Sequence, residues 1–184
     1  MFWSLVSRIC SPLLAVLHAP LHVDSDYTKM IEIEVSEVYA PNQMKLGFTT
    51  GVVGKDVPLP KITLEQKLRY AIGSACSVCE EKPFRKWADN WISGKDRTKA
   101  TAWATARAAW AIGVAEAAEA AEAIGAAEAA ETYETSEAAW VAWAVRAVAR
   151  AATFATAARK DLDLIRIAEW AVTDEPLSEL LEEE

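Results

Sequence analysis

Tryptophan and basic side chains alternate between residues 82 and 103, and this pattern is the strongest sign of a binding site in the sequence. The basic residues are Lys82, Arg85, Lys86, Lys95, Arg97 and Lys99, and the aromatic residues are Phe84, Trp87, Trp91 and Trp103. Aromatic faces beside guanidinium donors can hold a nucleotide, a base or a phosphate. Ordinary packing is the other interpretation, with the tryptophans turned inward and the basic side chains solvating the opposite face.

A second group of arginines lies among tryptophans further along the chain. Arg107 follows Trp103 by four residues, and Arg146 and Arg150 lie near Trp143. We expect Arg107 to form a cation–π contact or a buried ion pair, because a buried arginine needs a carboxylate or a ligand. An anion-binding pocket between helices is the alternative. The candidate residues for binding a ligand or a partner are therefore Arg85, Trp87, Trp91, Arg97, Trp103, Arg107, Arg146 and Arg150.

The cysteines predict core packing rather than a metal or redox site. Cys76 and Cys79 form a C-x-x-C pair, but a zinc site needs two further ligands, and the histidines, His18 and His22, both precede residue 30. A thioredoxin-type pair belongs at the start of a helix, whereas these cysteines fall late in a predicted one. With Cys10 the count is odd, which favours a reducing, cytoplasmic location.

Catalytic motifs are absent from the sequence. It contains no GxGxxG, GxxxxGK[ST], GxSxG or HExxH pattern. Histidine acid–base catalysis has no candidate beyond residue 22, and nothing distinguishes one carboxylate pair from the others. We therefore expect a protein that is not an enzyme and that has no cofactor or metal.

The charge distribution argues against binding to duplex nucleic acid. The net charge is −8, and residues 161–184 alone carry −8, so the first 160 residues are neutral overall. Generic nucleic-acid binding needs a basic footprint, so the overall charge disfavours it, although residues 61–100 form one basic region with a net charge of +4. The acidic residues 174–184 are expected to form a solvated tail, or a strip that attracts a basic partner. A final acidic turn or helix is expected after Pro176.

The N-terminal residues 1–29 are expected to be a leader, either poorly structured or forming an apolar helix. Its apolar run at residues 12–17 is too short to span a bilayer, and no clear signal-peptide cleavage site follows. We expect no membrane association.

The middle of the sequence predicts a β-hairpin followed by helices. Residues 30–54 alternate apolar and polar positions on both sides of a turn at Pro41-Asn42, and the stretch from Gly54 to Pro60, with two prolines, is expected to form a linker. Thr63 and Gln66 match a capping box for a helix that Pro83 ends or kinks. Further helices are expected at 84–92, from Asp96 to about Glu131 and at 137–159, with a break at Ser93-Gly94. Another helix is expected after a cap at Asp161 or Asp163.

The expected long helix contains the alanine- and glutamate-rich stretch AEAAEAAEAIGAAEAAE at residues 115–131. A heptad count from Trp103 places Trp110, Ala117 and Ile124 on one seam, and small residues on the adjacent one. We expect this seam to pack against residues 137–159 as an antiparallel hairpin, with the glutamates on the outside and only one narrow side buried. A solvated strut is the alternative.

These elements predict a mainly α protein, an antiparallel alanine-rich helical bundle with a small N-terminal β-hairpin. The domain boundaries would be a leader at 1–29, the hairpin and linker at 30–60, the helical domain at 61–173 and the acidic tail at 174–184.

Cys76 within a helix, Trp91 followed by Gly94, and two alanine-rich helices with interspersed aromatics together resemble the alanine-rich putative immunity proteins of bacterial polymorphic-toxin systems. Similar domains occur among phage proteins. The resemblance covers roughly residues 63–158. It implies an all-helical domain that works by binding a partner protein, with no catalytic residues.

The first functional hypothesis is thus a non-enzymatic protein, of the immunity or phage anti-defence type, that binds and neutralises a toxin or a defence protein. The second is a helical protein that binds a small molecule or nucleotide through the tryptophans and arginines. The third is a structural module that forms a homo-oligomer.

Overall fold

The computed structural model describes residues 11–18, 30–39, 47–111, 113–132, 137–159 and 161–182. Two compact units make up the chain, Met1–Lys61 and Ile62–Glu184. Within the described residues there are eight helices and one two-stranded antiparallel hairpin, so the predicted fold class is confirmed. Apart from residues 11–18, the predicted leader lies outside the described residues, as does the predicted turn at Pro41-Asn42.

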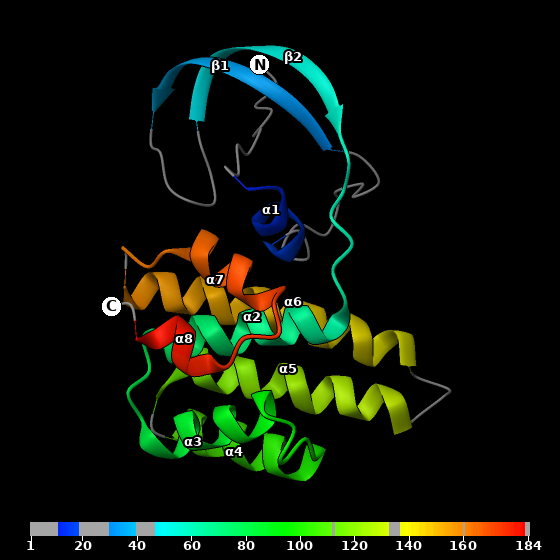
Figure 1. Cartoon of the computed structure of the whole chain (residues 1–184), viewed down its shortest axis with the longest axis vertical. Coiled ribbons are helices and arrows are strands. Elements are labelled where there is room, and N and C mark those ends of the chain that lie inside the picture. The colour runs from blue at the N-terminus through cyan, green and yellow to red at the C-terminus, as the bar shows by residue number, and fades with distance from the viewer. Residues whose placement is uncertain are drawn as a thin grey trace. The chain divides into compact units, whose positions relative to one another are not determined.

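The first unit contains helix α1 (Pro12–His18) and the hairpin of β1 (Met30–Tyr39) and β2 (Gly47–Val57), shown in Figure 1. The two strands pair in an antiparallel register that places Glu34 opposite Val52, with an irregularity between Ile31 and Ile33. Alternation of apolar and polar residues correctly predicts the hairpin, although β2 extends three residues beyond the expected end at residue 54.

The second unit is a bundle built around α5. Its helices are α2 (Leu64–Cys76), α3 (Lys82–Ile92), α4 (Lys99–Ala111), α5 (Ala115–Thr132), α6 (Glu137–Ala158), α7 (Leu164–Ala171) and α8 (Leu177–Leu181). Helix α4 packs on one side of α5, α2 and α6 pack on the other, and α7 and α8 pack on α2 (Figure 1). The predicted packing of residues 115–131 against 137–159 is therefore present.

Local sequence signals explain several of the helix boundaries. The capping box at the start of α2 is confirmed, because the Thr63 side chain accepts a hydrogen bond from the Gln66 backbone and the Gln66 side chain accepts one from the Thr63 backbone. Helix α2 ends at Cys76, before Pro83, which instead lies in the first turn of α3, where proline is well tolerated. Asp163 caps α7 as expected.

The prediction of one helix from Asp96 to Glu131 is wrong, because the chain reverses at Gly113. This glycine has φ of 78°, a left-handed conformation that favours glycine. Its N–H donates to the Trp110 carbonyl and the Val114 N–H donates to the Ala109 carbonyl, which is the hydrogen-bond pattern of a Schellman motif. The predicted break at Gly94, with φ of 74°, is confirmed and has the same pattern.

Gly113→Ala should lower the free energy of unfolding of the chain by about 1–2 kcal/mol, the usual cost of a left-handed non-glycine residue. An added Cβ meets no atom within 4 Å, so the backbone conformation alone causes the loss. Gly113→Asn is the matched control and should lose less, because asparagine tolerates this conformation. Chemical denaturation measures both; equal stability of Gly113→Ala and the wild type would contradict the role of the reversal.

Helix α5 is buried on most of its circumference, so the expectation of one narrow buried side is also wrong. The buried residues are Ala117, Ala118, Glu119, Ala120, Ala121, Ala123, Ile124, Ala126 and Ala127. Alanine adds little volume beyond the backbone, which allows neighbouring helices to approach closely. Because α4 folds back on α5, this helix has neighbours on opposite sides, and its alanines serve both contacts.

The acidic C-terminal segment contributes to the core of the second unit. Leu177 and Leu180 of α8 are buried. Arg69 donates to the Glu175 carbonyl and Trp170 Nε1 donates to the Pro176 carbonyl at 3.1 Å. Residues 174–182 are thus not simply a solvated tail. Among the helices that the structure describes, none combines the length and the apolar character needed to cross a bilayer.

Candidate functional site

The tryptophans of α3 pack inward. Trp87 and Trp91 are both buried, and the Phe84 and Trp87 rings lie 5.6 Å apart between centroids. Helical spacing of these three residues produces one apolar side, which faces the bundle. The tryptophans of α3 in the predicted cluster therefore belong to the core, in agreement with the packing interpretation.

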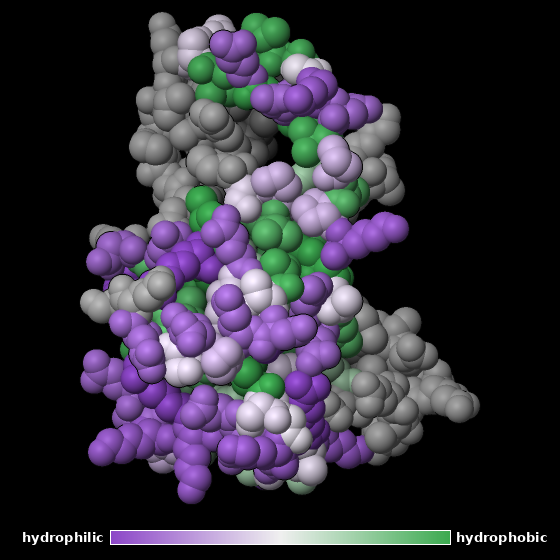
Figure 2. Space-filling model, in the orientation of Figure 1, coloured by the Kyte–Doolittle hydropathy of each residue, from purple (hydrophilic) through white to green (hydrophobic). Residues whose placement is uncertain are grey.

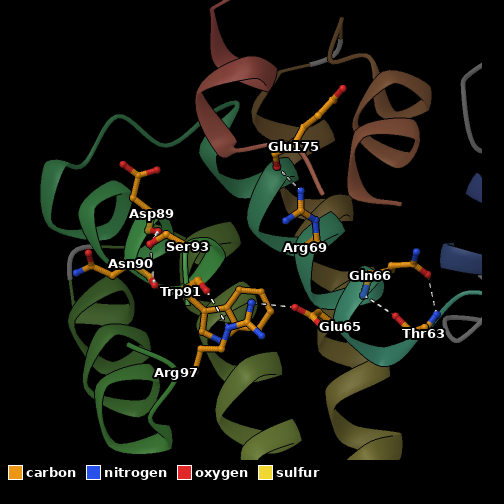
Figure 3. Close-up of polar contacts among 10 residues, drawn as sticks. All are labelled: Thr63, Glu65, Gln66, Arg69, Asp89, Asn90, Trp91, Ser93, Arg97 and Glu175. Atoms are coloured by element: carbon orange, nitrogen blue, oxygen red, sulfur yellow. Dashed lines mark hydrogen bonds and ion pairs between the residues drawn. The ribbon is translucent and has the colours of Figure 1, made fainter. Parts of the chain in front are cut away.

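The arginines next to these tryptophans bind groups of the chain itself. Arg85 donates from Nε to the Cys79 carbonyl at 2.8 Å and from Nη2 to the Cys76 carbonyl at 3.1 Å, so it satisfies one carbonyl in the last turn of α2 and one just beyond the helix. Arg97 lies over the Trp91 ring at 4.7 Å, donates to the Trp91 carbonyl and forms a 2.8 Å ion pair with Glu65 (Figure 3). Neither guanidinium is left fully open to a phosphate.

The two described cysteines are free thiols in the core, as predicted. Cys76 is the last residue of α2, and Cys79 lies beyond the helix end rather than within it. Burial raises the pKa of both thiols, with the neighbouring thiol adding to the effect at Cys76. Both side chains are therefore protonated at neutral pH, which makes them poor nucleophiles.

A different set of aromatic side chains remains exposed, along α4 and α6. Trp110 and Trp143 are 43% and 41% exposed. Trp103 lies 5.8 Å from Trp143, centroid to centroid, and its ring packs directly on Gly125 of α5. Trp110 Nε1 donates to Glu122 Oε1 at 2.6 Å. Trp110 is thus held by α5 directly, whereas Trp143 contacts Trp103, which packs on α5.

A buried ion pair lies beside these tryptophans. Glu119 of α5 is fully buried and its Oε1 accepts a hydrogen bond from Nη2 of Arg150 on α6, whose side chain is about half exposed. Oε2 of Glu119 has no hydrogen-bond partner among the described residues. The expectation that the glutamates of residues 115–131 lie outside is wrong for Glu119.

The remaining arginines of the prediction have different positions. Arg107 lies between Trp103 and Trp110 on the same side of α4, but it is exposed, so the expected buried pairing is wrong. The side chain of Arg146 lies outside the described residues. Phe154, 38% exposed, follows Arg150 by four residues on α6 and continues its side of that helix.

We call the surface formed by Trp103, Arg107, Trp110, Trp143, Arg150 and Phe154 the Trp–Arg face. Three residues of α5, Glu119, Glu122 and Gly125, contact Arg150, Trp110 and Trp103 of this surface. They are spaced by three positions, so each is offset by about 60° around α5 from the one before it. Sequence reasoning identified three of the six surface residues, namely Trp103, Arg107 and Arg150. The heptad count predicts Trp110 in the buried seam, and the same count along residues 137–159 predicts Trp143 and Phe154 there, but all three are exposed. A helix break at Gly113 is the signal that places Trp110 outside.

A cavity of about 430 Å³ lies between the α2–α3 connection, α4 and the start of α5. Cys79, Phe84, Ala108 and Val114 are among the residues that line it, with Glu81 and Thr105 supplying most of the polar character. The volume suits a small ligand, but the cavity lacks the convergent polar groups that orient one.

The chain matches no protein-family model, no curated protein and no solved structure.

Proposed function

We propose that the chain is a non-enzymatic binding protein whose Trp–Arg face engages a partner protein. The observation that carries the proposal is the exposure of Trp110 and Trp143 on one helical surface with Arg107 and Arg150. Tryptophan and arginine dominate the residues that contribute most to protein–protein affinity, because each combines a large contact area with directional donors. An indole has a large apolar area that is unfavourable to leave in water, so two exposed indoles on this surface favour its being covered by a partner.

Two tryptophan side chains of the Trp–Arg face are already fixed in position, which supports tight binding without rearrangement. Trp110 is fixed by its hydrogen bond to Glu122, and Trp103 is fixed between Gly125 and Trp143. Aromatic side chains that are already ordered lose little conformational entropy when a partner covers them. The net charge of −8 would also speed association with a basic partner.

Within this class, the resemblance to immunity proteins supports a protein that neutralises a toxin or a defence protein. The test uses the gene next to the one that encodes this chain. Expression of that neighbouring product should arrest growth of a host, and co-expression of the chain should restore growth.

Trp110→Ala and Trp143→Ala should each weaken the complex about 30-fold or more, which corresponds to a loss of about 2 kcal/mol at a central interface residue. Lys86→Ala, at an exposed position on α3, is the matched control and should protect the host like the wild type. Full protection by both tryptophan variants, with unchanged affinity, would show that the Trp–Arg face is not the binding surface.

Nucleotide binding remains the alternative hypothesis for the tryptophan and arginine residues. It requires that a nucleotide quench tryptophan fluorescence and raise the thermal stability of the chain. We expect neither effect across a nucleotide panel, because Arg85 and Arg97 already bind carbonyls of the chain.

A further inference from the structure

Strand β2 is exposed on both of its faces. Val52 and Val53 are 68% and 69% exposed, and successive residues of a strand point to opposite faces. Every residue from Thr49 to Asp56 is exposed. In Figure 2, hydrophobic side chains are visible at the surface of the hairpin beside hydrophilic ones. The two valines together show that neither face of β2 is covered at this point by the residues that the structure describes.

An isolated two-stranded hairpin is marginally stable, and its stability rises with a third or fourth strand. In the described part of the chain β2 pairs with β1 along one edge, and no other strand borders its second edge. A long, uncharged edge of this kind presents backbone donors and acceptors that favour strand addition. The hairpin therefore has both the apolar surface and the backbone edge that another strand would complete.

Charge distinguishes the two edges of the hairpin. Strand β1 carries Glu32 and Glu34 near its centre, so pairing of β1 with a second β1 would bring like charges together. Strand β2 has no charge from Gly47 to Gly54, and its two charged residues, Lys55 and Asp56, have opposite signs. Lys55 already lies 3.9 Å from Glu32 of β1. A second copy of β2 can therefore pair with β2 without repulsion between like charges, whereas a second copy of β1 cannot pair with β1 in this way.

We propose that β2 pairs antiparallel with β2 of a second copy of the chain, which produces a four-stranded sheet in the order β1-β2-β2-β1. A two-fold axis near Val52 places this residue opposite its own copy, as in other isologous contacts. The two Lys55 side chains then lie about six residues apart along the strands, roughly 20 Å, so they do not repel strongly. Each exposed valine gains cross-strand neighbours from the second copy on its own face of the enlarged sheet.

Sedimentation of the full chain tests the assembly. The wild type should have twice the 20.1 kDa chain mass at high concentration and dissociate on dilution. The double variant Val52→Lys/Val53→Lys should remain a monomer, because charges at both positions oppose each other across the axis. Its helical unit should unfold at the same denaturant concentration as the wild type, since that core is built from Ile62–Glu184. A monomeric wild type, or a double variant that still dimerises, would overturn the proposal.

Cysteine cross-linking identifies the edge without disturbing the assembly. In a Cys10→Ser background, Val52→Cys should form a disulfide-linked dimer under mild oxidation, because residues opposite each other in a sheet lie within disulfide range. Glu34→Cys is the matched control, because Glu34 lies opposite Val52 on β1 and so reports pairing through the other edge. It should stay monomeric. Faster cross-linking of Glu34→Cys than of Val52→Cys would refute the β2 pairing.

Discussion

Arg150→Met should lower the free energy of unfolding by about 3 kcal/mol at neutral pH, one of the two largest effects of a single substitution that we expect. The variant leaves the fully buried Glu119 carboxylate without its cation. Since Arg150 is about half exposed and partly screened by water, the value lies at the low end for a broken buried ion pair. Denaturant unfolding followed by circular dichroism gives the free energy.

The double variant Glu119→Gln/Arg150→Met is the control for this effect. It removes both charges and should be more stable than Arg150→Met alone, because a neutral amide costs less to bury than a carboxylate. If Arg150→Met is as stable as the wild type, Glu119 does not depend on Arg150 in the folded state.

The loss in Arg150→Met should also depend on pH. Burial raises the pKa of Glu119, the charge of Arg150 opposes this rise, and Glu122 adds to it. A carboxyl with a raised pKa binds more protons in the folded than in the unfolded chain, so its contribution to stability falls as pH rises above the ordinary value of about 4.3. Removal of Arg150 raises the pKa further. The stability difference between the variant and the wild type should therefore be smaller at about pH 5 than at about pH 7.5.

Trp170→Ala should cost about 3–5 kcal/mol, the range for loss of a buried tryptophan. Trp170 is buried, its ring stacks with the Arg69 guanidinium at 4.4 Å, and it contacts the position where Gly73 leaves space for it. Its Nε1 also donates to the Pro176 carbonyl, so the substitution weakens the attachment of α8. Denaturant unfolding measures the loss, and limited proteolysis should show earlier cleavage beyond residue 172.

Trp170→Phe is the matched variant, because it keeps an aromatic ring against Arg69 and removes the Nε1 donor. It should be intermediate in stability. A wild-type-like Trp170→Ala would mean that α7 and α8 contribute little to the bundle.

Much of the fold could be predicted from the sequence because its signals are local. The alternation of residues 31–36 indicates a strand, and Thr63 with Gln66 marks a helix start, since each depends on neighbours within a few positions. The reversal at Gly113 was missed because the residues around it are alanines and other good helix formers. A single glycine within such a run is compatible with either a continuous helix or an end.

That error explains most of the misplaced site residues. A continuous heptad count assigns Trp110 to the core, whereas the reversal turns α4 back on α5 and leaves Trp110 on the surface. The reversal at Gly113 also places α5 between α4 and α6, and Glu119 is buried there. The inward packing of Trp87 and Trp91 could be anticipated from their spacing on α3, but their neighbours Arg85 and Arg97 bind carbonyls that no sequence pattern identifies.

Calorimetric titration of the purified chain with the protein encoded beside it is the most direct test of the binding role of the Trp–Arg face. We predict that Trp143→Ala binds about 30-fold or more weakly than the wild type, while Lys86→Ala binds equally well. Circular dichroism should confirm that both variants are folded. Equal affinities of Trp143→Ala, Trp110→Ala and the wild type for that partner would contradict a binding role of the Trp–Arg face.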